Sequence, residues 1–225
     1  NERTIMRAFS NLLTNLILTS SRNRKISLLV EYFSSTPDPD RGYALAALTG
    51  SLKFKNIKAA FFKELVREKQ DEYLFALSYD YVGDLAETVS LLWDKKNDGD
   101  VPSLSTLIDT LTKFKSEELK RNVIDILDNS NADQRWAFIK LFTGGLRIGV
   151  SSRLVKQALA NYGNVDLEEI EKIWHGLHFP YINLFSWLEN KGKKPKISIY
   201  DIFHPMMLAH PLVIEKDLVV ANPKD

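Results

Sequence analysis

Apolar residues recur at intervals of three and four positions along most of the chain, which is the spacing of one face of an α-helix. In the first part of the chain this spacing predicts helices over residues 6–18, 26–33, 43–48, 57–66, 74–77 and 85–93. Polar turns separate these segments, as in Pro37-Asp38-Pro39-Asp40. The alternation of apolar and polar residues that marks a strand is almost absent, so the pattern predicts an all-α, multi-helix bundle.

A charged segment without apolar periodicity, residues 94–102, divides the chain in two. Beyond it, one helix is predicted after Ser103 and another from Ser116, and helical spacing continues in the segments 136–142, 154–159, 170–177 and 182–188. Ser103 and Asp166 stand just before two of these segments and are predicted N-caps. After a basic, broken segment at 191–196, the remaining residues read as extended chain interrupted by proline.

These elements predict one helical domain over residues 6–196, with halves of about 6–93 and 103–190. Residues 197–225 are predicted to be an extended C-terminal tail that acts as a linker. Residues 1–5 stand before Met6, which has the character of a natural start, so we expect these five to be additions to the native chain.

The two halves share a short motif. Thr49-Gly50-Ser51-Leu52-Lys53 matches Thr143-Gly144-Gly145-Leu146-Arg147, which lies 94 positions later. Asp40 and its neighbours match the residues from Asp133 at an offset of 93, and one inserted residue reconciles the two offsets. We interpret the likeness as an internal duplication with approximate two-fold symmetry. Two basic turns related in this way can follow the two strands of a duplex across its minor groove.

The second of these turns has the features of an anion-binding site. Three of the ten glycines of the chain fall within residues 144–149, and no acidic residue occurs from 143 to 161. Gly144 can end the preceding helix at positive φ, and Ser151 or Ser152 can cap the next. Gly145 and Gly149 leave the backbone N–H groups open to an anion at a helix N-terminus. The alternative is a tight connection between helices in which the glycines serve geometry alone.

Composition narrows the choice of partner and compartment. The net charge is +1, so contact with nucleic acid must come from local basic patches. The absence of cysteine excludes disulfides and thiolate metal sites and fits a reducing cytoplasm. We expect neither a membrane span nor a secretion signal. Four basic clusters, three of them at turns, are Arg22, Arg24 and Lys25; Lys53, Lys55 and Lys58; Arg147, Arg153 and Lys156; and Lys191, Lys193, Lys194 and Lys196.

No catalytic or metal-binding residue is predicted. Lys96-Asn97-Asp98-Gly99 fits the Lys-x-Asp-Gly pattern of nucleotidyltransferases, but it stands in a charged linker where no pocket can lower the lysine pKa. His175 and His178 have the spacing of metal ligands without a third ligand, so we interpret them as helix-end histidines. Asp84, which follows Gly83, is more simply a helix cap than part of a carboxylate site.

Three segments resemble a known family. Residues 142–150, followed by 154–160, are similar to the second-half signature of the N-terminal DNA-binding domain of ATP-dependent DNA ligases. Gly83-Asp84-Leu85-Ala86-Glu87-Thr88 resembles another signature of that domain. Phe203-His204-Pro205-Met206-Met207-Leu208-Ala209 resembles the segment that leads into the ligase catalytic core. The three segments stand in the family's order and span most of the chain.

The resemblance implies a helical, pseudo-two-fold bundle that binds nicked duplex DNA through its backbone and minor groove, without sequence preference. It implies a parent enzyme that seals nicks in replication, repair and recombination with ATP and Mg²⁺. The adenylated lysine of that enzyme would lie in a nucleotidyltransferase domain after the third segment, so this chain alone is expected to be inactive. Its expected partners are nicked DNA and the catalytic domain of the same polypeptide, in a monomeric, cytoplasmic, DNA-associated protein of bacterial type.

The resemblance and the basic turns together predict a set of DNA-binding residues. They are Arg22, Asn23, Lys25, Gly50, Ser51, Lys53, Gly83, Gly144, Gly145, Arg147, Gly149, Ser151, Ser152 and Lys156. The first turn has Ser51 and Lys55 where the second has glycines, so DNA is expected to approach its backbone less closely. The alternative function is a helical-repeat scaffold for protein partners, which would expose an apolar groove.

Overall fold

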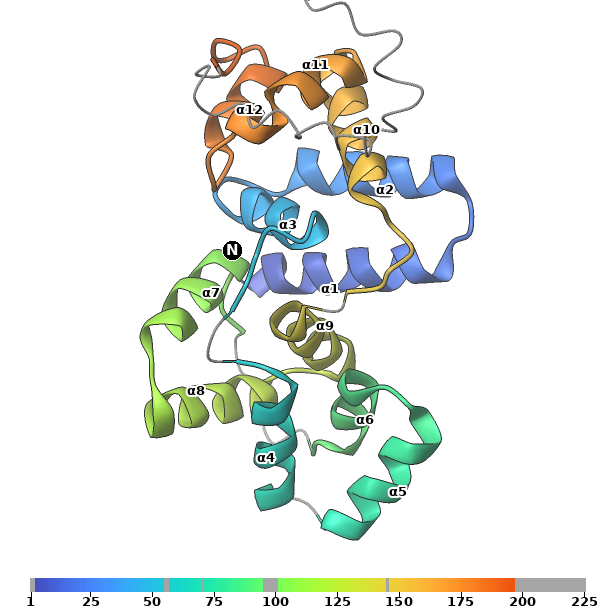
Figure 1. Cartoon of the computed structure of the whole chain (residues 1–225), viewed down its shortest axis with the longest axis vertical. Helices are drawn as coiled ribbons and strands as arrows, with labels where there is room; N and C mark the ends of the chain where they lie inside the picture. Colours follow the sequence, from blue (N-terminus) through green and yellow to red (C-terminus); the bar gives the residue numbers. More distant parts are fainter. Residues whose placement is uncertain (1–2, 55–56, 70, 95–100, 145, 197–225) are drawn as a thin grey trace, which may run out of the picture.

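The computed structural model describes residues 3–54, 57–69, 71–94, 101–144 and 146–196 (Figure 1). These residues form helices joined by turns, and none of them lies in a β-strand, which confirms the all-α prediction. In chain order the helices are α1 (Arg3–Leu18), α2 (Arg22–Ser35), α3 (Asp40–Leu48), α4 (Ala59–Lys69), α5 (Glu72–Val82), α6 (Leu85–Leu92), α7 (Leu104–Lys113), α8 (Ser116–Asn129), α9 (Ala132–Thr143), α10 (Ser152–Gly163), α11 (Leu167–Ile173), the 3-10 turn η1 (Trp174–Gly176) and α12 (Ile182–Leu188).

The helices form two groups stacked along the long axis of the molecule (Figure 1). Helices α2, α3, α10, α11 and α12 form the upper group, α4 to α8 form the lower group, and α1 and α9 lie between them. The most extensive packing joins α2 to α10, α6 to α9 and α1 to α9. Helices of the two predicted halves are therefore interleaved. That the halves are related by duplication stays a prediction.

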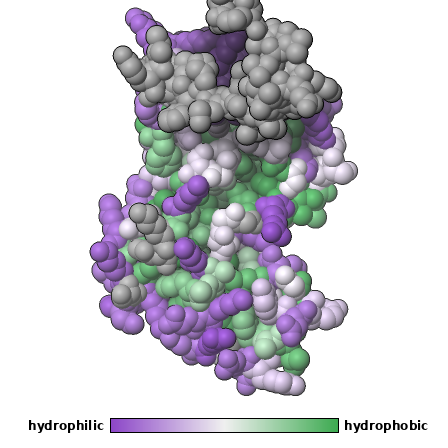
Figure 2. Space-filling view, viewed as in Figure 1, coloured by the Kyte–Doolittle hydropathy of each residue, from purple (hydrophilic) through white to green (hydrophobic). Residues whose placement is uncertain are grey.

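The predicted apolar stripes form the core. On α1, Phe9, Leu13 and Leu16 are fully buried at three- and four-residue spacing. On α9, Phe138 is fully buried, and its ring lies 4.9 Å from that of Phe142. Figure 2 shows hydrophobic residues reaching the surface in the middle of one face, with hydrophilic residues along its lower left edge.

Several helix ends follow the sequence predictions. The Ser103 hydroxyl accepts a hydrogen bond from the Thr106 N–H at 3.3 Å, and an Asp84 carboxylate oxygen accepts one from the Glu87 N–H at 2.9 Å. Asp166 occupies the N-cap position of α11 as predicted, but its side chain makes no capping hydrogen bond. Helix α4 begins at Ala59, and Ile57 is buried ahead of it, so its place in the apolar pattern reflects burial rather than a helical turn.

Two buried arginines occupy similar positions 94 residues apart. Arg41, in the first turn of α3, donates from Nη1 to the Phe33 carbonyl at 3.3 Å. Arg135, in the first turn of α9, donates from Nε to the Leu127 carbonyl at 2.8 Å. Each accepting carbonyl lies eight residues before its arginine, near the end of the preceding helix. The two arginines thus make a similar contact at the offset of 94 that also relates the two Thr-Gly turns.

Arg41 also joins helices of the upper group through an ionic network. Its Nε and Nη2 donate to the Asp38 carboxylate at 2.8 and 2.7 Å. Its Nη1 donates to the Tyr162 hydroxyl at 3.1 Å and to a carboxylate oxygen of Glu189. The buried guanidinium is therefore paired with two acids and links α3 to α10 and to the end of α12.

The Glu189 carboxylate should make the stability of the domain depend on pH. Hydrogen bonds from Arg41, Lys191 and Tyr162 lower the pKa of Glu189 to about 2, whereas the unfolded chain has a glutamate pKa of about 4.3. Because the folded state binds this proton more weakly, the stabilisation is complete above about pH 5 and is lost as the pH falls through 4 towards 2.

We expect the stability difference between wild type and Glu189→Gln to shrink as the pH falls from about 6 to about 3. Urea unfolding at a series of pH values measures this difference. A difference that stays constant over this range would show that Glu189 contributes no pH dependence.

Candidate nucleic-acid interface

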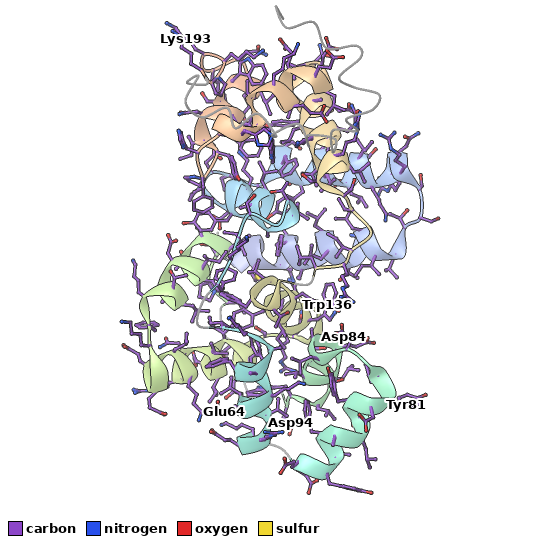
Figure 3. All side chains as sticks on the ribbon, in the orientation of Figure 1. Glu64, Tyr81, Asp84, Asp94, Trp136 and Lys193 are labelled. Atoms are coloured by element: carbon purple, nitrogen blue, oxygen red, sulfur yellow. The ribbon has the colours of Figure 1, made fainter. Side chains whose placement is uncertain are left out.

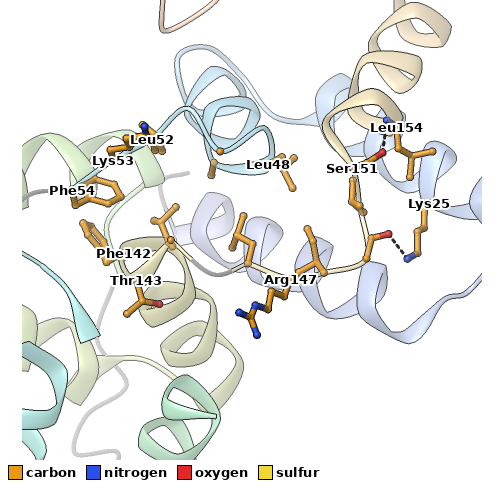
Figure 4. A pocket seen from close by; sticks show the side chains of 18 of the residues that line it. Lys25, Leu48, Leu52, Lys53, Phe54, Phe142, Thr143, Arg147, Ser151 and Leu154 are labelled. Atoms are coloured by element: carbon orange, nitrogen blue, oxygen red, sulfur yellow. Dashed lines mark hydrogen bonds between the residues drawn. The ribbon is translucent and has the colours of Figure 1, made fainter. Parts of the chain in front are cut away.

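The two basic turns and the start of α2 meet around one cavity. Its volume is about 1200 Å³. We call residues 49–54 the first turn and residues 143–151 the second turn; Gly145 lies outside the described residues. Eight predicted residues line the cavity, namely Arg22, Lys25, Gly50, Lys53, Gly144, Arg147, Gly149 and Ser151 (Figure 4). The fold thus brings together basic segments that are far apart in the sequence.

The two turns leave their helices in the same way. The Thr49 hydroxyl donates to the Leu45 carbonyl at 2.8 Å, and the Thr143 hydroxyl donates to the Ile139 carbonyl at 2.7 Å. Gly50 and Gly144 then have φ values of +73° and +74°, in the left-handed region that glycine adopts without strain. Both glycines are exposed, and beyond the neighbouring residues nothing lies within 4 Å of where a Cβ would stand at either one.

The second turn places Arg147 at the edge of the cavity. Ile148 is buried next to it, while the Arg147 side chain is exposed and extends away from the turn (Figure 4). Arg147 has a φ of +39°, which is costly for a residue with a Cβ, so the surrounding structure must hold it there. The part of the chain that the structure describes offers no carboxylate paired with Arg147 or Lys53. Both charges are therefore available to an anion.

Apolar side chains form the floor between the turns. Leu52 and Phe54 of the first turn line the cavity together with Phe142 and Leu146. The rings of Phe54 and Phe142 lie 4.3 Å apart and hold the first turn against the end of α9. Sequence reasoning did not select Phe54, although an apolar residue follows the basic residue in both turns.

Lys58 also lines the cavity. The sequence placed it in a basic cluster, but it was not selected as a contact because it is separated from the first-turn motif. Its position gives the cavity a further cation.

The other predicted residues do not line the cavity. Asn23 and Ser152 are exposed in the first turns of α2 and α10, and the Ser51 hydroxyl lies 3.2 Å from that of Thr49. Lys156 is half-buried, with its ammonium 4.8 Å from the centre of the Trp174 ring. Gly83, with a φ of +74°, ends α5 in the lower group. The structure therefore gathers the turn residues but separates Gly83 and Lys156 from them.

The chain is related to a known protein family. A family model described as DNA ligase N terminus matches residues 6–160, well over half of the chain. The chain belongs to this family. It is the N-terminal domain family of ATP-dependent DNA ligases, so the resemblance seen in the sequence is confirmed. No curated protein matches the chain.

The matched region of this DNA ligase N-terminal family contains both turns and the start of α2. It ends before α11, η1 and α12, although α10 packs against both α11 and α12. The candidate site therefore lies wholly inside the family match.

Gly83 and Asp84, from the second segment that resembles the family, lie outside the cavity between the turns, although Asp84 and Arg147 line a smaller neighbouring pocket. A carboxylate oxygen of Asp84 accepts a hydrogen bond from the Lys140 ammonium on α9, whose C-terminal end leads into the second turn. Burial acts to raise the pKa of Asp84, but the hydrogen bonds from Lys140 and from the Glu87 N–H outweigh it and lower that pKa. This ionic contact joins the start of α6 to α9, and Asp84 does not line the cavity between the turns.

Within the described residues, no group of three or more His, Asp or Glu side chains could hold a metal ion, and His175 and His178 are exposed. The Lys96 motif and residues 197–225 lie outside the described residues. Within the described ranges, no helix is both long and apolar enough to span a membrane.

Proposed function

We propose that this domain binds nicked duplex DNA without sequence preference, through contacts with the sugar-phosphate backbone along the minor groove. The observation that carries the proposal is the meeting of two Thr-Gly turns, each with an unpaired basic residue, around one cavity. Contacts to phosphate and sugar position a protein on a duplex but carry no direct sequence information. Two such turns would each follow one strand, with the apolar floor between them.

In the parent ligase, this domain would hold the nicked ends for a nucleotidyltransferase domain of the same polypeptide. That domain would supply the lysine, ATP and Mg²⁺ of the sealing reaction. The present chain, a monomer in this proposal, would bind DNA but would not react with ATP. Its membership of the ligase family supports this division of roles.

A fluorescence-anisotropy titration with nicked duplex at several salt concentrations tests the proposal. If Arg22, Lys53 and Arg147 each neutralise one phosphate, the plot of log affinity against log salt should have a slope of about −3. An intact duplex of the same sequence measures nick preference, and a second sequence measures base preference. Absent binding, or binding that does not change with salt, would contradict the proposal.

A protein-docking scaffold is the second candidate function, and one observation favours it. Five large side chains on α5 and α6 are exposed, with relative accessibilities of 75% for Tyr73, 50% for Leu74, 51% for Leu77, 93% for Tyr81 and 66% for Leu91. Tyr81 points outward from α5 (Figure 3). A scaffold would keep its function when the turn charges are removed, whereas a DNA-binding domain would lose it.

A further inference from the structure

We infer that Lys25 is a positioning residue that holds the second turn in place, rather than one of the cations that neutralise phosphate. The inference rests on the proposed function. Lys25 and Gly149 of the second turn are 124 residues apart in the sequence, yet the Lys25 ammonium donates a hydrogen bond to the Gly149 carbonyl at 2.8 Å (Figure 4). A hydrogen bond from an ammonium group is stronger than one between neutral groups.

The position of the ammonium is set by the elements around it. Lys25 lies in the first turn of α2, next to the buried Ile26, and α2 packs extensively against α10. The Lys25 side chain is half-buried, whereas Arg22 and Arg24 beside it are exposed. Packing of α2 on α10 therefore directs this one lysine at the segment that precedes α10.

Gly149 is shaped to receive this contact. Its φ is +65°, which disfavours a residue with a Cβ. A Cβ at this position would also stand 2.7 Å from the Lys25 nitrogen, so the end of the lysine side chain would have to shift. Glycine is therefore required here mainly by the backbone conformation.

The Lys25 contact completes a three-point attachment of the second turn. Ile148 is buried in the core, the Gly149 carbonyl is bound by Lys25, and the Ser151 hydroxyl caps α10 by accepting from the Leu154 N–H at 3.2 Å. Arg147, held at positive φ, directly precedes these points. Without Lys25, the carbonyl between the other two attachments has no protein partner in the described structure, so the orientation of Arg147 should be less well fixed.

The salt dependence of binding distinguishes a positioning residue from a phosphate contact. Removal of one phosphate contact lowers the magnitude of the salt slope by about 0.9. Removal of a contact inside the protein weakens binding at every salt concentration and leaves the slope unchanged. Lys25→Met and Lys53→Met are a matched pair, because each removes one positive charge from the same cavity.

The experiment combines anisotropy titrations of nicked duplex at four salt concentrations with hydrogen exchange of the free protein. We expect Lys25→Met to weaken binding about fivefold with an unchanged slope, and to speed exchange of the amides of residues 146–151. Lys53→Met should lower the slope magnitude by about one and leave that exchange unchanged. Lys25→Arg, which keeps a donor, should restore part of the protection.

A slope that falls by about one in Lys25→Met, or unchanged exchange at residues 146–151, would overturn the inference. The exchange measurement needs no DNA, so it tests the role of Lys25 even if the wild-type protein fails to bind nicked duplex. Circular dichroism of Lys25→Met and of the more polar Lys25→Gln verifies that the helices are intact.

Discussion

The double variant Lys53→Gln/Arg147→Gln should bind nicked duplex DNA at least about 30-fold more weakly than wild type at moderate salt. It removes one free cation from each basic turn, and two charge-assisted phosphate contacts should be worth about 2–3 kcal/mol together. The magnitude of the salt slope should fall by about two. Its stability should change by less than about 0.5 kcal/mol, because both side chains are exposed and unpaired in the described structure.

Lys113→Gln/Lys193→Gln is the matched control for that variant. Both lysines are exposed and neither lines the cavity, so the control has the same net charge change at other sites. Lys193 lies at the far upper end of the molecule (Figure 3). Anisotropy at three salt concentrations compares the two variants. Equal losses of affinity would mean that overall charge, and not the two turns, determines binding.

Replacement of Arg41 by methionine should lower the free energy of unfolding by about 3–5 kcal/mol. The side chain is buried and pairs with Asp38 and Glu189, and its guanidinium carbon lies 4.3 Å from the centre of the Phe185 ring. Methionine fills much of the volume but leaves Glu189, itself only 19% exposed, without its buried cation. Typical domains are stable by only about 5–15 kcal/mol, so this loss is a large fraction of the total.

Urea denaturation measures this loss, with Arg41→Lys and Arg121→Met as comparisons. Lysine should restore little stability, because a single ammonium cannot reproduce the planar group that binds Asp38 through two nitrogens. Arg121 is exposed, so its replacement should be nearly neutral. A loss below about 1 kcal/mol for Arg41→Met would mean that the ionic network only balances its own desolvation.

The helices were predictable because each buries a stripe of its own residues, and such a stripe is visible in a short window of sequence. The spacing of Phe9, Leu13 and Leu16 on α1 is an example. The basic turns were predictable for a similar reason, since glycines and cations stand together locally. The sequence could not show that Ile57 lies ahead of α4 and not within it, because a buried residue is apolar in both cases.

The contacts that assemble the site were not predictable in this way. The Phe54–Phe142 ring contact and the Lys25–Gly149 hydrogen bond each join residues from distant parts of the chain. They depend on which helices pack together, and local patterns carry no information about that choice. Similar residue types around Asp40 and Asp133 lie 93 positions apart in the sequence. Arg41 and Arg135, which make similar buried hydrogen bonds, lie 94 positions apart, and only the structure shows this correspondence.

The interleaving of the helices has a consequence for synthesis of the protein. Helix α2 packs mainly against α10, which leaves the ribosome more than 100 residues later. At about 5–20 residues per second, α10 follows α2 by at least several seconds, and Phe185 of α12, whose ring lies 5.5 Å from that of Phe33 on α2, follows later still. During that interval the nascent chain offers an apolar surface to chaperones, and the cavity between the turns cannot exist until α9 and α10 have emerged.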